Sequence, residues 1–266
     1  MKNYILTLVI FFLQTSVALP QIDTWTQITG DGFGFPSQTT VPEMEVFNGY
    51  LYASTSPTDP GLATLWRTAT GDSGSWSAIT NYTPSLNADG SIHTFGTTSL
   101  GGGYMWFGTG NGKVGTIIYQ SQDGENWTAI SKRGFGNKLL TGAAPHMVVF
   151  KASNDSSYLY AGAGSHGEGT AGQVWRTYYT NTDSTKWELL IDFASIDTGV
   201  QTITYFYVWN NTLYLEQITE DNYGNLLMVR SLHKTPSLEM VLETIPILYY
   251  HRLLYFKIRS MLLPQI

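Results

Sequence analysis

Apolar and polar residues alternate over short stretches of this chain, as they do in strands that are buried on one face. Residues 50–55 alternate aromatic with small side chains, and they follow an Asn-Gly dipeptide that is typical of a tight hairpin turn. Apolar-rich runs at 40–47, 62–69 and 76–79 are separated by segments containing Gly, Pro, Asp and Ser. No stripe at helical spacing appears before residue 245. The pattern predicts four antiparallel strands in about 50 residues, the size of one propeller blade.

The same pattern recurs along the chain at a nearly constant period. Trp25, Trp76 and Trp127 are each 51 residues apart, and Trp187 follows after 60. Two strand sequences recur with this period: 50–53 again at 104–107, 158–161 and 212–215, and 65–68 again at 118–121, 174–177 and 228–231. Repeats of this length are typical of propeller blades. We therefore predict an all-β fold, a β-propeller of four-stranded antiparallel blades with about four recognisable blades, incomplete or irregular in its closure.

The two ends of the chain depart from the repeat. Residues 24–28 match the fourth strand of a blade whose first three strands are missing. The segment 245–266 contains no glycine and is enriched in Leu, Tyr, Arg and Lys, which indicates either an amphipathic terminal element or a truncated or misread gene end. We therefore assign the blades to residues 19–244 and treat 245–266 as an anomalous C-terminal segment.

The N-terminus has the pattern of an export signal. Lys2 is followed by an apolar run at residues 4–13 and by Ser16-Val17-Ala18, which fits the small-x-small pattern of a cleavage site. Ten apolar residues are too few to span a bilayer, and the charges in 245–266 disfavour a span there. We predict a signal peptide at residues 1–18, a secreted protein and no membrane span in the mature chain.

Composition narrows the classes of partner. The 266 residues include 42% hydrophobic residues and have a formal net charge of −6, and the chain without Lys2 and its last 22 residues has 10 basic against 20 acidic residues. An acidic surface repels phosphate, so nucleic acid is not an expected partner. Cysteine is absent, which excludes disulfides and thiolate metal sites. Asn-x-Ser/Thr sequons predict candidate glycosylation at Asn81, Asn154 and Asn210; a fourth sequon, at Asn126, is less suitable because it contains Trp127.

An aspartate precedes three of the repeated tryptophans by four residues. These pairs are Asp72 with Trp76, Asp123 with Trp127, and Asp183 with Trp187. In the middle copy the sequence is Ser121-Gln122-Asp123-Gly124-Glu125-Asn126-Trp127, which resembles the Asp-box, or bacterial neuraminidase repeat, of sialidase-like β-propellers. The family pattern usually has one more residue between Asp and Trp.

The resemblance implies a structural role for this motif. In that family the Asp-box lies on the outer turns of the blades and is remote from the catalytic face. We expect the carboxylate to accept hydrogen bonds from turn amides, Gly124 to adopt a positive φ, and Trp127 to pack between neighbouring sheets.

Three arginines occupy equivalent strand positions in the repeats: Arg67, Arg176 and Arg230. Such a repeated residue can serve packing or ion pairs between blades. Alternatively, a ring of arginines facing the propeller axis could hold an anionic ligand. These three residues are therefore the candidate ligand-binding residues of the sequence.

Two functions of different classes remain open. We favour a secreted, non-catalytic propeller that binds carbohydrate or an extracellular protein through loops on one face, with Tyr104, Trp106 and Trp209 as candidate contacts. The alternative is a sialidase-like glycoside hydrolase, which the family resemblance associates with three arginines, a tyrosine nucleophile activated by a glutamate, and an aspartate acid/base. The early Phe/Tyr-Arg-Ile-Pro motif is not found, although Glu168 or Glu216 could activate a tyrosine. We predict no catalytic residue, metal site or cofactor.

Overall fold

The computed structural model describes residues 26–57, 63–81, 91–140, 147–151, 156–164, 170–195, 199–209, 212–219, 226–234 and 240–248, and from residue 216 onward it describes the backbone alone. The expected signal peptide at 1–18, the first repeated tryptophan, Trp25, and the sequons at Asn154 and Asn210 lie outside these residues. So do residues 249–266 of the C-terminal segment.

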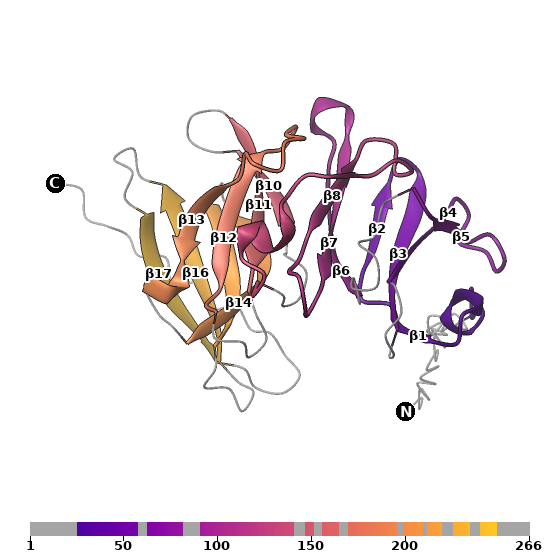
Figure 1. Cartoon of the computed structure of the whole chain (residues 1–266), viewed down its shortest axis with the longest axis horizontal. Helices are drawn as coiled ribbons and strands as arrows, with labels where there is room; N and C mark the ends of the chain where they lie inside the picture. The colour runs from indigo at the N-terminus through magenta and orange to yellow at the C-terminus, as the bar shows by residue number, and fades with distance from the viewer. Residues whose placement is uncertain are drawn as a thin grey trace, which may run out of the picture.

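The chain forms four antiparallel sheets that follow one another in sequence order (Figure 1). Sheet 1 contains β1 (Gln38–Thr40), β2 (Met44–Phe47), β3 (Tyr50–Pro57), β4 (Thr64–Thr68) and β5 (Ser77–Ile79). Sheet 2 contains β6 (Ser91–Thr98), β7 (Tyr104–Gly110), β8 (Ile118–Ser121) and β9 (Thr128–Ala129). Sheet 3 contains β10 (Met147–Lys151), β11 (Ser157–Ala163), β12 (Gln173–Tyr178) and β13 (Glu188–Asp192). Sheet 4 contains β14 (Val200–Trp209), β15 (Thr212–Thr219), β16 (Leu226–Lys234) and β17 (Met240–Leu248).

In sheets 2, 3 and 4 the strands pair in the order in which they occur, whereas in sheet 1 both β1 and β2 pair with β3, which pairs with β4 and then β5. Contacts between adjacent sheets join β2 to β6, β6 to β10 and β10 to β14. This arrangement is a β-propeller with four blades, which confirms the predicted fold class. The ring is not closed, because sheets 1 and 4 lie at opposite ends of the molecule (Figure 1). The described residues contain no α-helix, only the short 3₁₀ turns η1 (Asp31–Gly34), η2 (Leu100–Gly102), η3 (Arg133–Gly136) and η4 (Phe193–Ser195).

The first strand of sheet 1 is interrupted. We expected one strand over 40–47, but β1 and β2 are separate and both pair with β3, through Gln38↔Pro57 and Met44↔Ala53. Pro42 lies in the interruption, where it has no N–H to donate to a ladder. The proline therefore divides one predicted strand into two.

Apolar side chains fill the space between adjacent sheets, and each pair of neighbours has its own cluster. The seam between sheets 1 and 2 includes Tyr52, Leu65, Phe107 and Trp127. The seam between sheets 2 and 3 includes Trp106, Ile118, Ile130 and Leu159. The seam between sheets 3 and 4 includes Tyr160, Val174, Ile203 and Leu215. The core is thus divided into layers that alternate with the sheets.

Two of the repeated tryptophans, Trp127 and Trp187, lie at these seams. Trp127 is 8% exposed, and its ring centroid is 4.7 Å from that of Phe107. Trp187 joins sheet 3 to sheet 2, because its Nε1 donates a hydrogen bond to the carbonyl oxygen of Ile130 at 2.6 Å. At these two positions, therefore, the repeated tryptophan marks where one sheet packs against the previous one.

The last strand extends beyond the end of the recognisable repeat. β17 pairs with β16 along its whole length, from Lys234↔Met240 to Leu226↔Leu248. Residues 245–248 therefore belong to sheet 4. No helix among the described residues is long and apolar enough to cross a membrane.

Candidate functional site

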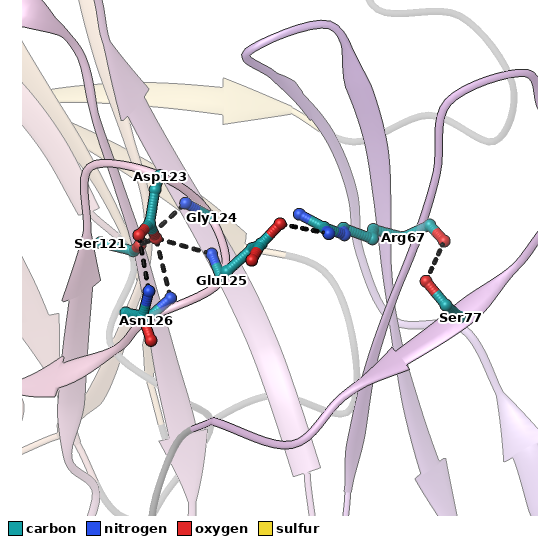
Figure 2. Close-up of polar contacts among 7 residues, drawn as sticks. All are labelled: Arg67, Ser77, Ser121, Asp123, Gly124, Glu125 and Asn126. Carbon is teal, nitrogen blue, oxygen red and sulfur yellow. Dashed lines mark hydrogen bonds and ion pairs between the residues drawn. The ribbon is translucent and has the colours of Figure 1, made fainter.

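The loop between β8 and β9 carries the sequence 121–127, which resembles an Asp-box, and is held by one carboxylate (Figure 2). Asp123 Oδ1 accepts hydrogen bonds from the backbone amides of Glu125 and Asn126, both at 2.8 Å, and from the Ser121 hydroxyl at 2.9 Å. Asp123 Oδ2 accepts the Asn126 side-chain amide at 2.7 Å. Gly124 has φ +74°, and its amide donates to Ser121 Oγ at 2.8 Å. The carboxylate thus closes the turn that leads to the seam tryptophan.

These hydrogen bonds control the ionisation of Asp123. Partial burial raises the pKa of the carboxyl, but the backbone and side-chain amides of Asn126, the Glu125 amide and the Ser121 hydroxyl lower it more. The net effect is a pKa well below the usual range for aspartate. Asp123 is therefore a charged structural group, and its environment is the opposite of the one that a general acid needs.

The other two aspartates hold their turns differently. Asp183 Oδ1 accepts the backbone amide of Thr185 at 2.9 Å and its hydroxyl at 2.7 Å, and these bonds lower the pKa of Asp183. In sheet 1 the hydroxyl of Thr68 accepts the amides of Thr70 and Gly71, at 3.2 and 3.0 Å. Asp72 contributes its backbone carbonyl there, which accepts the Ser75 hydroxyl at 2.6 Å.

Arg67 is placed by β4, opposite Tyr52 on β3. Its guanidinium lies 4.6 Å from the ring centroid of Tyr50, and its Nη2 is 2.5 Å from Glu125 Oε1 in the β8–β9 loop of sheet 2 (Figure 2). Burial lowers the pKa of Arg67, but the hydrogen bond to Glu125 and the nearby Tyr52 hydroxyl outweigh it and leave this pKa raised. This arginine therefore joins sheet 1 to the adjacent loop of sheet 2.

Arg176 occupies the equivalent position on β12, opposite Tyr160 on β11. Its guanidinium lies 4.6 Å from the ring centroid of Tyr158 and forms an ion pair of 2.8 Å with Glu188. Hydrogen bonds to Tyr160 and Glu188 raise the pKa of Arg176 against the opposing effect of burial. The Arg176 guanidinium thus pairs with a glutamate of its own sheet, whereas Arg67 pairs with the next sheet.

An exposed tyrosine extends the Arg176 group to the surface. The Tyr178 side chain is 56% exposed, and its ring is stacked on that of Tyr158, with centroids 4.7 Å apart and planes at 24°. The hydroxyl of Tyr158 donates to that of Tyr178 at 3.3 Å, and this contact raises the pKa of Tyr178. We call Tyr158, Arg176, Tyr178 and Glu188 the sheet 3 cluster.

The structure does not bring the three predicted arginines together. Arg67 lies on β4 of sheet 1 and Arg176 on β12 of sheet 3, with sheet 2 between them, and each has an acidic partner within the chain. Arg230 lies on β16, where its backbone pairs with Leu215 and Thr244. Sequence reasoning did not select Tyr178 or Glu188, although both belong to the repeat: Glu188 follows the seam tryptophan directly, and Tyr178 follows the strand sequence 174–177.

The remaining candidates have the following environments. Asn81 is exposed and follows β5, and its carbonyl accepts the Trp127 amide at 3.3 Å. Tyr104 and Trp106 stack at 5.7 Å, with Trp106 fully buried. Among the described residues no three His, Asp or Glu side chains are grouped so as to hold a metal ion. On β14, Tyr205 pairs with Glu216 of β15, so these two residues share one face of sheet 4.

Comparisons with known proteins bear on the fold. The sequence matches no protein-family profile and no curated protein. A luciferin-regenerating enzyme shares the fold with a TM-score of 0.50 and 11% identity, over 77% of this chain and 61% of that chain. An α-L-arabinofuranosidase from Clostridium thermocellum has a TM-score of 0.46 and 14% identity over 82% of this chain and 76% of its own. An α-L-arabinanase mutant from Cellvibrio cellulosa has a TM-score of 0.42 and 16% identity over 76% of each chain.

Proposed function

We propose that the chain is a secreted, non-catalytic β-propeller that binds carbohydrate through the sheet 3 cluster. The observation that carries the proposal is the exposed ring of Tyr178, stacked on Tyr158 beside the ion pair of Arg176 and Glu188. Secretion rests on the export pattern of residues 1–18. Kinship with Asp-box propellers is part of the proposal and rests on the hydrogen bonds of Asp123.

The chemistry of the cluster suits a sugar ring. A pyranose has apolar C–H faces and a rim of hydroxyl groups, so it needs a flat apolar surface next to donors and acceptors. The Tyr178 ring supplies the flat surface, and its large exposed area is lost from water when a ligand covers it. The Arg176 guanidinium and the Glu188 carboxylate, which is 59% exposed, supply a donor and an acceptor within the same cluster.

Binding to an array of purified oligosaccharides, followed by calorimetric titration of the glycans retained, tests this function. We expect Tyr178→Ala to weaken binding about tenfold, which corresponds to about 1.4 kcal/mol. Phe35→Ala is a matched control, because the Phe35 side chain is 57% exposed but belongs to the N-terminal side of sheet 1. Absence of glycan retention by the wild-type chain, or an equal loss in both variants, would reject the proposal.

A sialidase-like hydrolase is the second candidate, and one observation favours it. Tyr205 and Glu216 are paired in the backbone register of β14 and β15, and a tyrosine nucleophile needs a base such as glutamate nearby. Against it, Arg67 and Arg176 are engaged in ion pairs in different sheets. Release of a fluorogenic aglycone from a sialoside by the wild-type chain, abolished in Tyr205→Phe, would establish the enzyme and displace the non-catalytic assignment.

A further inference from the structure

Two turns of the molecule have the same sequence and conformation. η1 and η3 both contain Gly-Phe-Gly, and in each the first glycine and the phenylalanine are left-handed, with φ +56° and +58° in η1 and +52° and +53° in η3. Phe135 of η3 is stacked on Trp175 at 4.8 Å and meets Trp187 edge-on at 5.1 Å. Phe33 of η1 is stacked on Trp66 at 5.0 Å and meets Trp76 edge-on at 5.1 Å. Each turn thus packs on the outer strands of the sheet that follows it.

The residues that precede η1 and η3 have different surroundings. η3 follows β9, the outer strand of sheet 2, and sheet 2 covers the face of sheet 3 on which Phe135 packs. Ile130, between β9 and η3, is fully buried and accepts the Trp187 Nε1 hydrogen bond. Ile28 stands at the same position before η1 but is 39% exposed.

The face of sheet 1 beside η1 is apolar and exposed. We define the leading face of a sheet as the face turned toward the preceding sheet, and the trailing face as the opposite one. On the leading face of sheet 1, β2 carries Met44 and Val46, with exposed fractions of 45% and 64%. Met44 pairs with Ala53, which pairs with Trp66, so this strip is continuous with the interface that η1 makes on sheet 1. The η1 turn of the same chain therefore already packs on part of the leading face of sheet 1.

The other end of the molecule offers the matching face. On β14 of sheet 4, Phe206 points into the seam with sheet 3, so Tyr205 and Tyr207 belong to the trailing face, where they are 44% and 48% exposed. Their rings are nearly parallel, at 24° and 6.1 Å. Every internal seam joins the trailing face of one sheet to the leading face of the next. The leading face of sheet 1 and the trailing face of sheet 4 are the two that no described sheet covers, and Figure 1 shows these sheets at opposite ends.

We propose that the leading face of sheet 1 binds the trailing face of sheet 4 of a second copy of this chain. The contact reproduces the internal seams, because it joins the same two kinds of face around the strip of Met44 and Val46 and the pair of Tyr205 and Tyr207. It is a head-to-tail contact between two different surfaces, which closes into a ring or continues into a filament according to the rotation between copies.

Light scattering coupled to size-exclusion chromatography tests the contact with two complementary variants. Val46→Glu places a charge on the leading face of sheet 1, and Tyr207→Glu places one on the trailing face of sheet 4. We expect the wild-type full chain to exceed the mass of one chain at about 100 µM and each variant alone to remain a monomer, with the dissociation constant raised at least about tenfold. Val114→Glu, at a 39% exposed position in the loop between β7 and β8, should associate as the wild type does.

Mixing the two variants distinguishes this contact from others. Each variant retains the face that the other has lost, so an equimolar mixture should form a dimer through one intact contact. A symmetric contact, in which each copy uses the same surface, would not be restored by mixing. A monomeric wild-type chain, association that survives Val46→Glu in a variant with wild-type circular dichroism, or a mixture that stays monomeric would overturn the proposal.

Discussion

At the scale of single residues, the repeated aspartates share a position in sequence but not a hydrogen-bonding role. Asp123 accepts four hydrogen bonds through its carboxylate, and Asp183 accepts two from Thr185. In sheet 1 the hydroxyl of Thr68 binds the turn amides, and Asp72 uses its backbone carbonyl. Because the same turn can be closed by a hydroxyl or by a carboxylate, the spacing of Asp and Trp predicted the turn but not which side chain holds it.

This difference predicts unequal costs for the same substitution. Asp123→Asn should lower the free energy of unfolding by about 1 kcal/mol at pH 7, because the amide replaces a charged acceptor that serves two backbone amides. Asp72→Asn should change it by less than about 0.5 kcal/mol, since surface substitutions that leave backbone contacts in place have small effects. Urea unfolding at equilibrium measures both, and equal costs would contradict the assignment of roles.

The low pKa of Asp123 predicts a dependence on acid. In the unfolded chain an aspartate titrates near about 3.9, and in the folded chain it titrates lower, so the unfolded state takes up the proton first as the pH falls. The stability that Asp123 adds is therefore complete above about pH 5 and is lost as the pH falls through about 4 toward the folded-state pKa. The difference in unfolding free energy between the wild type and Asp123→Asn should shrink between pH 5 and 3. A difference that stays constant over that interval would show that ionisation of Asp123 does not contribute.

At the scale of elements, strand positions were predictable and turns were predictable only in part. Alternating aromatic and small side chains placed β3 and its three counterparts, because the alternation reflects burial between two sheets. Pro42 divides the predicted first strand into two. A proline interrupts a strand only where its missing N–H would have formed a ladder hydrogen bond, and the sequence does not show where that is the case. The sequence analysis did not predict the Gly-Phe-Gly turns, although the tripeptide occurs twice, at 32–34 and 134–136. The structural role of Phe33 and Phe135 comes from their packing against two tryptophans each, which the sequence does not show.

The packing of η3 predicts a measurable loss when its aromatic ring is removed. Phe135→Ala removes a half-buried ring from between Trp175 and Trp187, so the free energy of unfolding should fall by about 2 kcal/mol, less than for a fully buried ring. Phe35→Ala, at a largely exposed ring, should cost less than about 1 kcal/mol. Thermal and urea unfolding followed by tryptophan fluorescence compare the two, and equal losses would reject the anchoring role of Phe135.

At the scale of the whole molecule, the period of the sequence predicted the sheet order, the open ring and the place of the seam tryptophans. The candidate site was predicted less well. Equivalent positions in a repeat imply equivalent strands, but the partner of a side chain depends on the adjacent loop, and so Arg67 reaches Glu125 in sheet 2 whereas Arg176 reaches Glu188 in its own sheet. The sequence contains both glutamates without indicating which arginine each one meets.

The layered core predicts which sheets are destabilised by a substitution in one seam. Among the described strands, the main contacts between sheets join neighbouring sheets, so we expect stability to be a sum of sheet and seam contributions, as in other repeat proteins. Phe107→Ala opens a cavity at a fully buried position in the seam of sheets 1 and 2 and should cost about 3 kcal/mol. Hydrogen exchange should then accelerate most in β3 to β5, which are held on that side by this seam alone, and least in β10 to β13. A substitution in the seam of sheets 3 and 4, such as Val174→Ala, should instead accelerate hydrogen exchange least in sheet 1, because that seam lies at the other end of the molecule. An equal acceleration in all four sheets would mean that the arc unfolds as one cooperative unit and that its seams are not independent.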